Sequence, residues 1–164
     1  MTIFKEPEMM EIGSKAPNIA VLDDQDKEVY LKDYQGQYLV LYAYPRDNTP
    51  GCTTEACSFR DNLAVIRELG ATVVGISADS VASHQKFKDK HQLNFPLLAD
   101  TEHKLLEELG AWGEKISFGK KRMGIKRSTF LFDKEGVLVK VWPKVSPSDH
   151  PLEIAEFLKE LQSK

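Results

Sequence analysis

The seven-residue run Tyr38–Tyr44, YLVLYAY, constrains the fold more than any other part of this sequence. Every residue in it is apolar or aromatic, and strands with this composition are buried on both faces of a sheet. Thr72–Ser77 has the same character. Between the two runs, apolar residues recur every three or four positions from Pro50 to about Leu69, which predicts a helix that Gly70 ends. A strand, a helix and a second strand in this order predict a layered α/β sheet.

The rest of the chain extends this pattern. Short β-forming runs flank the polar turn DDQDKE and predict an N-terminal hairpin, whereas the basic, glycine-containing stretch 113–127 predicts a loop. The other predicted elements are a helix at Ser80–His91, a strand at Phe95–Ala99, a helix at Glu102–Leu109, strands at Thr129–Asp133 and Val137–Trp142, and a helix at Pro151–Leu161. This order is typical of a thioredoxin-like α/β fold: a mixed central sheet flanked by helices, with an N-terminal β-hairpin extension and a small βα insert.

Length and charge narrow the class of protein. The 164 residues fit a single domain spanning 1–164. The formal net charge of −3 gives no electrostatic reason to expect a nucleic-acid partner. The apolar runs are too short to cross a bilayer, and the N-terminal MTIFKEPEMMEIG carries acids where a signal peptide needs a basic and then an apolar region. We expect a cytoplasmic protein with no membrane or nucleic-acid partner.

The two cysteines, Cys52 and Cys57, lie close together. Two are too few for a secreted disulfide scaffold, and in a reducing compartment a close pair is more often catalytic or metal-binding. Thr49 is a good N-cap and Pro50 suits the first helical position, so Cys52 falls in the first helical turn. Unpaired backbone N–H groups and the helix dipole stabilise a thiolate there. A buried, inert cysteine is the alternative, and this helix start directly after a buried strand disfavours it.

Cys57 follows Cys52 by five residues. On an ideal helix the two Cα atoms then lie about 8.7 Å apart. A disulfide requires Cα atoms closer than about 7 Å. Either Cys57 is a core residue, or the helix must unwind for the two thiols to bond.

Other cysteine chemistries fit the sequence less well. A thioredoxin-type reductase would show C-x-x-C, whereas this spacing is C-x-x-x-x-C. A zinc site needs three or four ligands, and the histidines are remote in sequence, so we expect no metal or cofactor. We interpret the histidines as surface or packing residues. A Cys–His hydrolase stays formally open, because a histidine could approach in space.

Pro45-x-x-x-Thr49-x-x-Cys52 resembles the active-site motif of the peroxiredoxins, the thiol peroxidases. The second cysteine, in CTTEACSFRD, is similar to that of the bacterioferritin comigratory protein or Q-type subfamily. The resemblance covers nearly the whole chain and includes GSKAPNIAVLDDQ, VVGIS, FPLLAD and the RSTF string that begins at Arg127. The segment Trp142–Pro151 departs from the basic, glycine-containing stretch of that subfamily.

The resemblance implies a reaction cycle. Cys52 attacks hydrogen peroxide or an organic hydroperoxide and becomes a sulfenic acid. Cys57 then condenses with it to form an intramolecular disulfide, which an external dithiol such as thioredoxin reduces. Because the resolving cysteine lies in the same chain, we expect a monomer.

The resemblance also implies roles around Cys52. Arg127 is the cation that stabilises the charge developing on the breaking O–O bond. The Thr49 hydroxyl and the Cys52 backbone N–H are hydrogen-bond donors, and Pro45 shields the site from water. Glu55 could simply be a first-turn acid favoured by the helix dipole, but the resemblance favours an ion pair that holds Arg127 in place.

Three neighbouring residues keep two interpretations each, and so does the activity. Arg60 could join the network around Arg127 or be an exposed helix residue, and Tyr44 and Phe59 could wall a peroxide pocket or pack in the core. Outside the peroxidase interpretation, a disulfide oxidoreductase on the same fold and a non-enzymatic redox sensor remain as alternatives.

Overall fold

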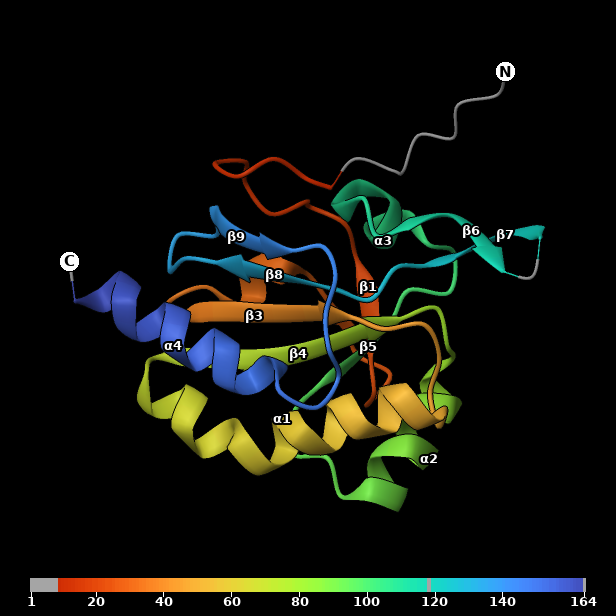
Figure 1. Cartoon of the computed structure of the whole chain (residues 1–164), viewed down its shortest axis with the longest axis horizontal. Coiled ribbons are helices and arrows are strands. Elements are labelled where there is room, and N and C mark those ends of the chain that lie inside the picture. The colour runs from red at the N-terminus through yellow and green to blue at the C-terminus, as the bar shows by residue number, and fades with distance from the viewer. Residues whose placement is uncertain (1–8, 118, 164) are drawn as a thin grey trace.

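The computed structural model describes residues 9–117 and 119–163, which form a central sheet with helices on its two faces (Figure 1). The strands of this sheet are β1 (Val21–Asp23), β2 (Glu28–Val29), β3 (Tyr38–Ala43), β4 (Ala71–Ser77), β5 (Leu97–Ala99), β8 (Ser128–Phe132) and β9 (Leu138–Trp142). The helices are α1 (Pro50–Glu68), α2 (Val81–His91), α3 (Lys104–Leu109) and α4 (His150–Gln162), with a short 3-10 helix at Leu31–Tyr34. No helix within the described ranges combines the length and apolar character that a membrane span requires.

The sheet has the order β2-β1-β5-β4-β3-β8-β9 and is mixed, as the sequence predicted. The central strands β5, β4 and β3 are parallel, because helices connect them. β8 and β9 pair antiparallel along one edge, and the N-terminal hairpin β1–β2 extends the other edge through antiparallel pairing of β1 with β5. The predicted small βα insert is therefore built into the main sheet through β5.

Alternating residues of β3 face two separate hydrophobic cores, which is why this strand reads as continuously apolar. Val40 and Tyr42 pack with α1, α2 and α4 on one face. Leu39 and Leu41 pack with α3 and the 3-10 helix on the other. Figure 1 shows α1 and α2 below the sheet and α3 above it, while α4 lies at the left, packed against α1.

The prediction of a loop over 113–127 was wrong. β6 (Trp112–Ser117) and β7 (Lys120–Ile125) form a two-stranded antiparallel hairpin that projects from the sheet (Figure 1). Its turn contains Gly119 at φ +75°, a conformation that glycine adopts without strain. The first four residues of β7 are exposed, so this strand lacks the apolar alternation that marks a half-buried strand in a sequence. Local backbone pairing forms the hairpin instead.

Strand pairing brings distant segments to the end of β3. Ala43, the last residue of β3, is paired with Ile76 of β4 and with Ser128 at the start of β8. Because β8 runs antiparallel to β3, the residue that precedes β8 lies beside the C-terminal end of β3, where the loop to α1 begins. The residues that follow β4 and lead to α2 lie at this same end of the sheet.

Candidate active site

Cys52 lies in the first turn of α1, at the end of β3, and its side chain is buried at 1% exposure. Arg127, directly before β8, donates a hydrogen bond from Nη2 to Cys52 Sγ over 3.2 Å. Its Nη1 donates to Glu55 Oε1 over 2.7 Å, an ion pair one turn further along α1. The guanidinium thus bridges a sulfur and a carboxylate on the same helix face. The predicted Glu55–Arg127 ion pair is confirmed.

Burial and the charge of Arg127 act in opposite directions on the pKa of Glu55. The Glu55 side chain has no exposed surface, and among the described residues its Oε2 receives no hydrogen bond. Burial raises the pKa of Glu55 to about 7, and the charge and hydrogen bond of Arg127 oppose that rise. The Arg127 guanidinium faces both the Glu55 carboxyl group and the Cys52 thiol. When Glu55 is protonated, its negative charge no longer offsets the charge of Arg127, so Arg127 stabilises a Cys52 thiolate more strongly.

Gly51 makes room for this arrangement, which sequence reasoning did not foresee. A Cβ atom at Gly51 would lie 3.2 Å from Arg127 Nη2 and 3.9 Å from Pro147 Cγ. A side chain there would press on the guanidinium, so the glycine of the TPGC string allows Arg127 to approach the helix start. Pro147 lies near Gly51 as well, so part of the divergent segment Trp142–Pro151 is beside the site.

Thr49 occupies the N-cap position of α1, but its side chain makes no capping hydrogen bond. The Thr49 hydroxyl donates instead to the Arg46 carbonyl over 2.9 Å. In this state its lone pairs, and not its proton, are available to a bound molecule, so the predicted donor role requires the hydroxyl to rotate. Pro45 is half-buried at the start of the same loop.

Cys57 is half-buried on α1, and both cysteines are free thiols. The helix is continuous from Pro50 to Glu68, so the two cysteines stand five positions apart in regular α-helix. A disulfide between them is incompatible with this geometry. The structure therefore represents the reduced form, with α1 intact.

Three residues considered from the sequence make no contact with the Arg127 guanidinium among the described interactions. Arg60 does not join the Arg127 network, because its Nε contacts Asp61 and its Nη1 donates to the His91 carbonyl. Phe59 is a core residue whose ring stacks on Tyr42 at 4.5 Å between centroids. Tyr44 is also buried, and its hydroxyl donates to Asp47 over 2.6 Å.

Lys115 of β6 is a second cation near the site. Burial lowers the pKa of Lys115, the charge of Arg127 lowers it further, and Cys52 acts in the opposite direction. Its aliphatic stem packs over Gly124 of β7, where a Cβ atom would lie 3.3 Å from Lys115 Cδ. No sequence signal separated Lys115 from the other basic residues of the run 113–127, because the hairpin that orients it was not predicted.

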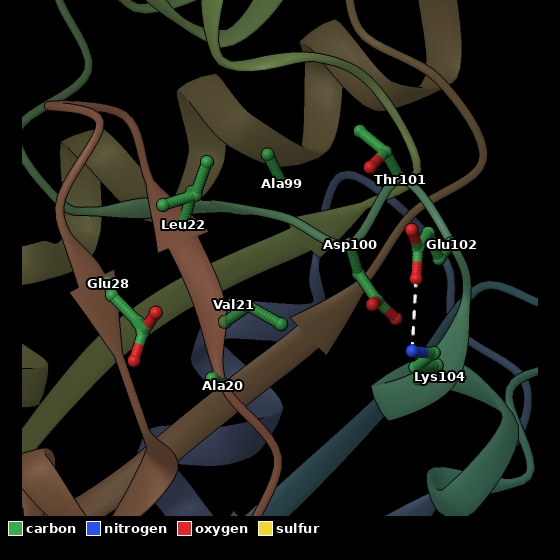
Figure 2. Close-up of a pocket in the computed structure, with 9 residues that line it drawn as sticks. All are labelled: Ala20, Val21, Leu22, Glu28, Ala99, Asp100, Thr101, Glu102 and Lys104. Carbon is green, nitrogen blue, oxygen red and sulfur yellow. Dashed lines mark ion pairs between the residues drawn. The ribbon is translucent and has the colours of Figure 1, made fainter.

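A cavity of about 200 Å³ lies apart from these residues, between the N-terminal hairpin and the start of α3 (Figure 2). Three carboxylates line it, and its only cation, Lys104, pairs with Glu102 over 3.1 Å. Asp100 accepts a hydrogen bond from the Leu106 amide at 2.7 Å. None of the residues that line it is a cysteine, so the thiol chemistry is confined to the site at α1.

Comparison with known proteins agrees with this geometry. Residues 12–141 match the model of the AhpC/TSA family. Peroxiredoxin Bcp of Bacillus subtilis (strain 168) is 53% identical over 155 residues, which cover 94% of this chain and 99% of that protein.

Solved structures show the same likeness. Peroxiredoxin Q of Xylella fastidiosa, a cysteine-to-serine variant, has a TM-score of 0.88 at 35% identity and covers 94% of this chain and 99% of its own. The bacterioferritin comigratory protein of Xanthomonas campestris, described as having alkyl peroxide reduction activity, has a TM-score of 0.84 at 35% identity over 92% of this chain and 96% of that one. These matches confirm the predicted thioredoxin-like fold. The site has a buried cysteine at a helix start, and an arginine bridges this cysteine to a glutamate. This geometry and the sequence matches lead to one conclusion: the chain belongs to the AhpC/TSA family and is a peroxiredoxin.

Proposed function

We propose that this peroxiredoxin reduces hydrogen peroxide and organic hydroperoxides at Cys52, through a sulfenic acid that Cys57 resolves. The observation that carries the proposal is the hydrogen bond from Arg127 Nη2 to the buried Cys52 Sγ. It places a permanent positive charge beside the one thiol in the first turn of α1. The alkyl peroxide reduction activity described for the Xanthomonas campestris neighbour supports the inclusion of organic hydroperoxides.

The first step transfers one oxygen atom. The Cys52 thiolate attacks the terminal oxygen of ROOH, the S–O bond forms and the O–O bond breaks. The RO⁻ group leaves and takes up a proton, which gives an alcohol, or water when R is hydrogen. Sulfur is oxidised by two electrons and the peroxide is reduced by two. Arg127 and the backbone amides of the first turn of α1 stabilise the negative charge that moves onto the oxygens. The hydrogen bond from Arg127 to Cys52 supports this role.

Ionisation of the thiol cannot be the main source of rate. A thiol with an ordinary pKa near 8.5 is about 3% ionised at pH 7. Complete ionisation therefore gains only about 30-fold, or about 2 kcal/mol. The larger contribution must come from stabilising the transition state and from holding the peroxide in line with the sulfur.

Resolution joins the two cysteines. The Cys57 thiolate attacks the sulfur of the Cys52 sulfenic acid, the S–S bond forms and hydroxide leaves as water. Because the cysteines stand five positions apart on one helix, the first turns of α1 must unwind for this step. A dithiol reductant such as thioredoxin then reduces the disulfide by thiol–disulfide exchange. We further propose that the protein acts as a cytoplasmic monomer, since resolution within one chain needs no partner subunit.

Continuous peroxide consumption with thioredoxin, thioredoxin reductase and NADPH tests the proposal. We expect NADPH oxidation that depends on both peroxide and this protein. A disulfide oxidoreductase would instead reduce insulin disulfides without peroxide, and a redox sensor would oxidise once and stop. Either of those results would contradict the proposed activity.

Substitution of Cys57 by serine should separate the two halves of the cycle. We expect Cys52 to react with peroxide at nearly the wild-type rate in a single turnover, because Cys57 lies outside the Arg127 contacts. Recycling with thioredoxin should fall at least tenfold, and dimedone should trap the sulfenic acid that accumulates. Stopped-flow oxidation and steady-state turnover measure the two halves. If the variant recycles at the wild-type rate, the reductant attacks the sulfenic acid directly and Cys57 is only a packing residue.

Disulfide formation should unfold the start of α1. We expect amides from about Cys52 to Phe59 to exchange hydrogen faster in the oxidised protein, while β3 and β4 stay protected. Gly51, Thr53 and Thr54 are weaker helix formers than alanine, which keeps the cost of unwinding moderate. The Cys57→Ser variant treated with the same oxidant is the control and should keep its protection. Equal protection in both redox forms of the wild type would contradict local unwinding.

A further inference from the structure

A buried polar cluster joins the loop between β3 and α1 to helix α2. Asp47 lies in this loop, between Pro45 and Thr49, and is 7% exposed. Its Oδ1 accepts a hydrogen bond from the Tyr44 hydroxyl over 2.6 Å. Its Oδ2 accepts from Ser83 Oγ over 2.8 Å and lies 2.7 Å from His84 Nδ1. We call Tyr44, Asp47, Ser83 and His84 the loop anchor.

Both ring nitrogens of His84 have hydrogen-bond partners. The ring has no exposed surface, and its Nε2 lies 2.9 Å from the Leu98 carbonyl, which can only accept a hydrogen bond. Nδ1 faces the Asp47 carboxylate. Burial and the Asp47 charge raise the pKa of Tyr44, so its hydroxyl keeps its proton and donates to that carboxylate. In these contacts Nε2 donates to the Leu98 carbonyl, and Nδ1 and the Asp47 carboxyl group share one hydrogen bond.

Two residues of the loop anchor, together with Asp79, have the spacing of metal ligands, but their hydrogen bonds argue against a metal site. Asp47, Asp79 and His84 could bring three ligand atoms within 4.8 Å of one another. However, both Asp47 oxygens and both His84 nitrogens already have hydrogen-bond partners. Asp79 Oδ2 accepts from Ser77 Oγ at 2.6 Å and from the Asp47 amide at 2.8 Å. A metal ion would have to displace these hydrogen bonds, so the cluster is better suited to fixing a loop.

Further contacts fix the loop to the same region. The Asp47 amide hydrogen bond to Asp79 holds the loop backbone to the segment that precedes α2. Asn48 has φ +62°, in the left-handed region that asparagine tolerates better than most residues. Its Oδ1 accepts a hydrogen bond from Lys90 Nζ of α2 over 3.2 Å. The backbone between Pro45 and Thr49 is thus held by α2 on one side while Arg127 approaches the start of α1 on the other.

We propose that Asp47 and His84 are positioning residues for the peroxidase reaction. They fix the loop so that Pro45 and Thr49 stand in register with Cys52. The inference rests on the proposed function, because it concerns the rate at which Cys52 reacts with peroxide. A displacement of about 1 Å in groups that line up a substrate can cost about a hundredfold in rate. Asp47 lies within two residues of both Pro45 and Thr49, so loss of the hydrogen bonds to its carboxylate should displace both residues.

Two substitutions of His84 separate its two hydrogen bonds. The amide nitrogen of asparagine can take the place of Nδ1, and that of glutamine can take the place of Nε2. His84→Asn therefore keeps a donor to Asp47, whereas His84→Gln keeps only the donor to Leu98. We expect His84→Gln to slow Cys52 oxidation by hydrogen peroxide ten- to fiftyfold and His84→Asn to restore the rate to within about fivefold of wild type.

Alkylation of Cys52 by iodoacetamide, in a Cys57→Ser background, distinguishes positioning from general loosening. Alkylation does not depend on how a peroxide is aligned with the sulfur. In His84→Gln the alkylation rate should therefore stay near that of wild type, so that the ratio of the peroxide rate to the alkylation rate falls only because the peroxide rate falls. A loosened fold would raise alkylation and expose other regions to hydrogen exchange. Lys88→Met is the matched control, because it breaks an ion pair of α2 with Asp24 and leaves the loop contacts intact. It should leave the ratio unchanged.

The outcomes distinguish a failure of the positioning role from a failure of the proposed peroxidase function. A wild-type protein whose Cys52 does not react with peroxide contradicts the proposed function itself. If wild type reacts, an unchanged ratio in His84→Gln, an equal fall in His84→Asn or an equal fall in Lys88→Met overturns the positioning role. Should His84→Gln fail to fold, Ser83→Ala removes one donor to Asp47 without changing charge. It should lower the ratio three- to tenfold, and an unchanged ratio overturns the proposal.

Discussion

Replacement of Cys52 by serine is expected to abolish peroxide reduction, with turnover falling to the background of the assay. In this variant a hydroxyl oxygen takes the place of the sulfur to which Arg127 Nη2 donates a hydrogen bond. An un-ionised alcohol is a poor nucleophile toward oxygen, and serine has no counterpart to the sulfenic acid. Cys57 cannot replace it, because the Arg127 contacts go to Cys52 and Glu55.

The measurement is hydrogen peroxide consumption in the thioredoxin-coupled assay, with the melting temperature as a control for folding. Cys57→Ser is the matched control in a single-turnover measurement by stopped flow, since it also removes one thiol from α1 but should still react once with peroxide. Retained turnover in Cys52→Ser would contradict the assignment of Cys52 as the nucleophile.

Replacement of Arg127 by alanine is expected to lower the rate constant for Cys52 oxidation by about a hundredfold or more. This corresponds to about 2.7 kcal/mol of transition-state stabilisation, the usual cost of losing one such donor. Lysine should restore the rate only in part, because a single ammonium lacks the planar fork that lets Arg127 donate to Cys52 and Glu55 together. Stopped-flow oxidation by hydrogen peroxide measures the rate constant.

Glu55 complicates this variant and supplies its control. Without Arg127, the buried Glu55 carboxylate loses its ion-pair partner, which costs stability and raises its pKa further. The double variant Glu55→Gln/Arg127→Ala removes that buried charge and should recover stability while its rate stays low. Arg122→Ala, at an exposed position of the same basic run, should be unchanged. A drop of only a few-fold in Arg127→Ala would show that Arg127 does not act on the transition state.

The central elements of the fold were predictable because their signals are local. The apolar run at β3, the helical periodicity of α1 and the glycine that follows it each depend on neighbours within about twenty residues. The hairpin β6–β7 was missed for the opposite reason. Most of β7 faces solvent, so no apolar pattern reveals a strand whose pairing comes from its backbone alone.

The candidate site also combines residues that local sequence identified with contacts that only the tertiary structure shows. Pro45, Thr49 and Cys52 share one loop and helix start, and their spacing alone indicated a thiolate at a helix N-terminus and the resemblance to the peroxiredoxins. Arg127 was assigned by that resemblance, whereas its hydrogen bond to Cys52 across 75 residues of sequence comes from the antiparallel pairing of β8 with β3. The anchor between Asp47 and His84, 37 residues apart, arises because β3 and β4 are parallel and end at the same edge. Only the tertiary structure could decide these contacts, because sheet pairing brings together side chains whose separation along the chain carries no periodic signal.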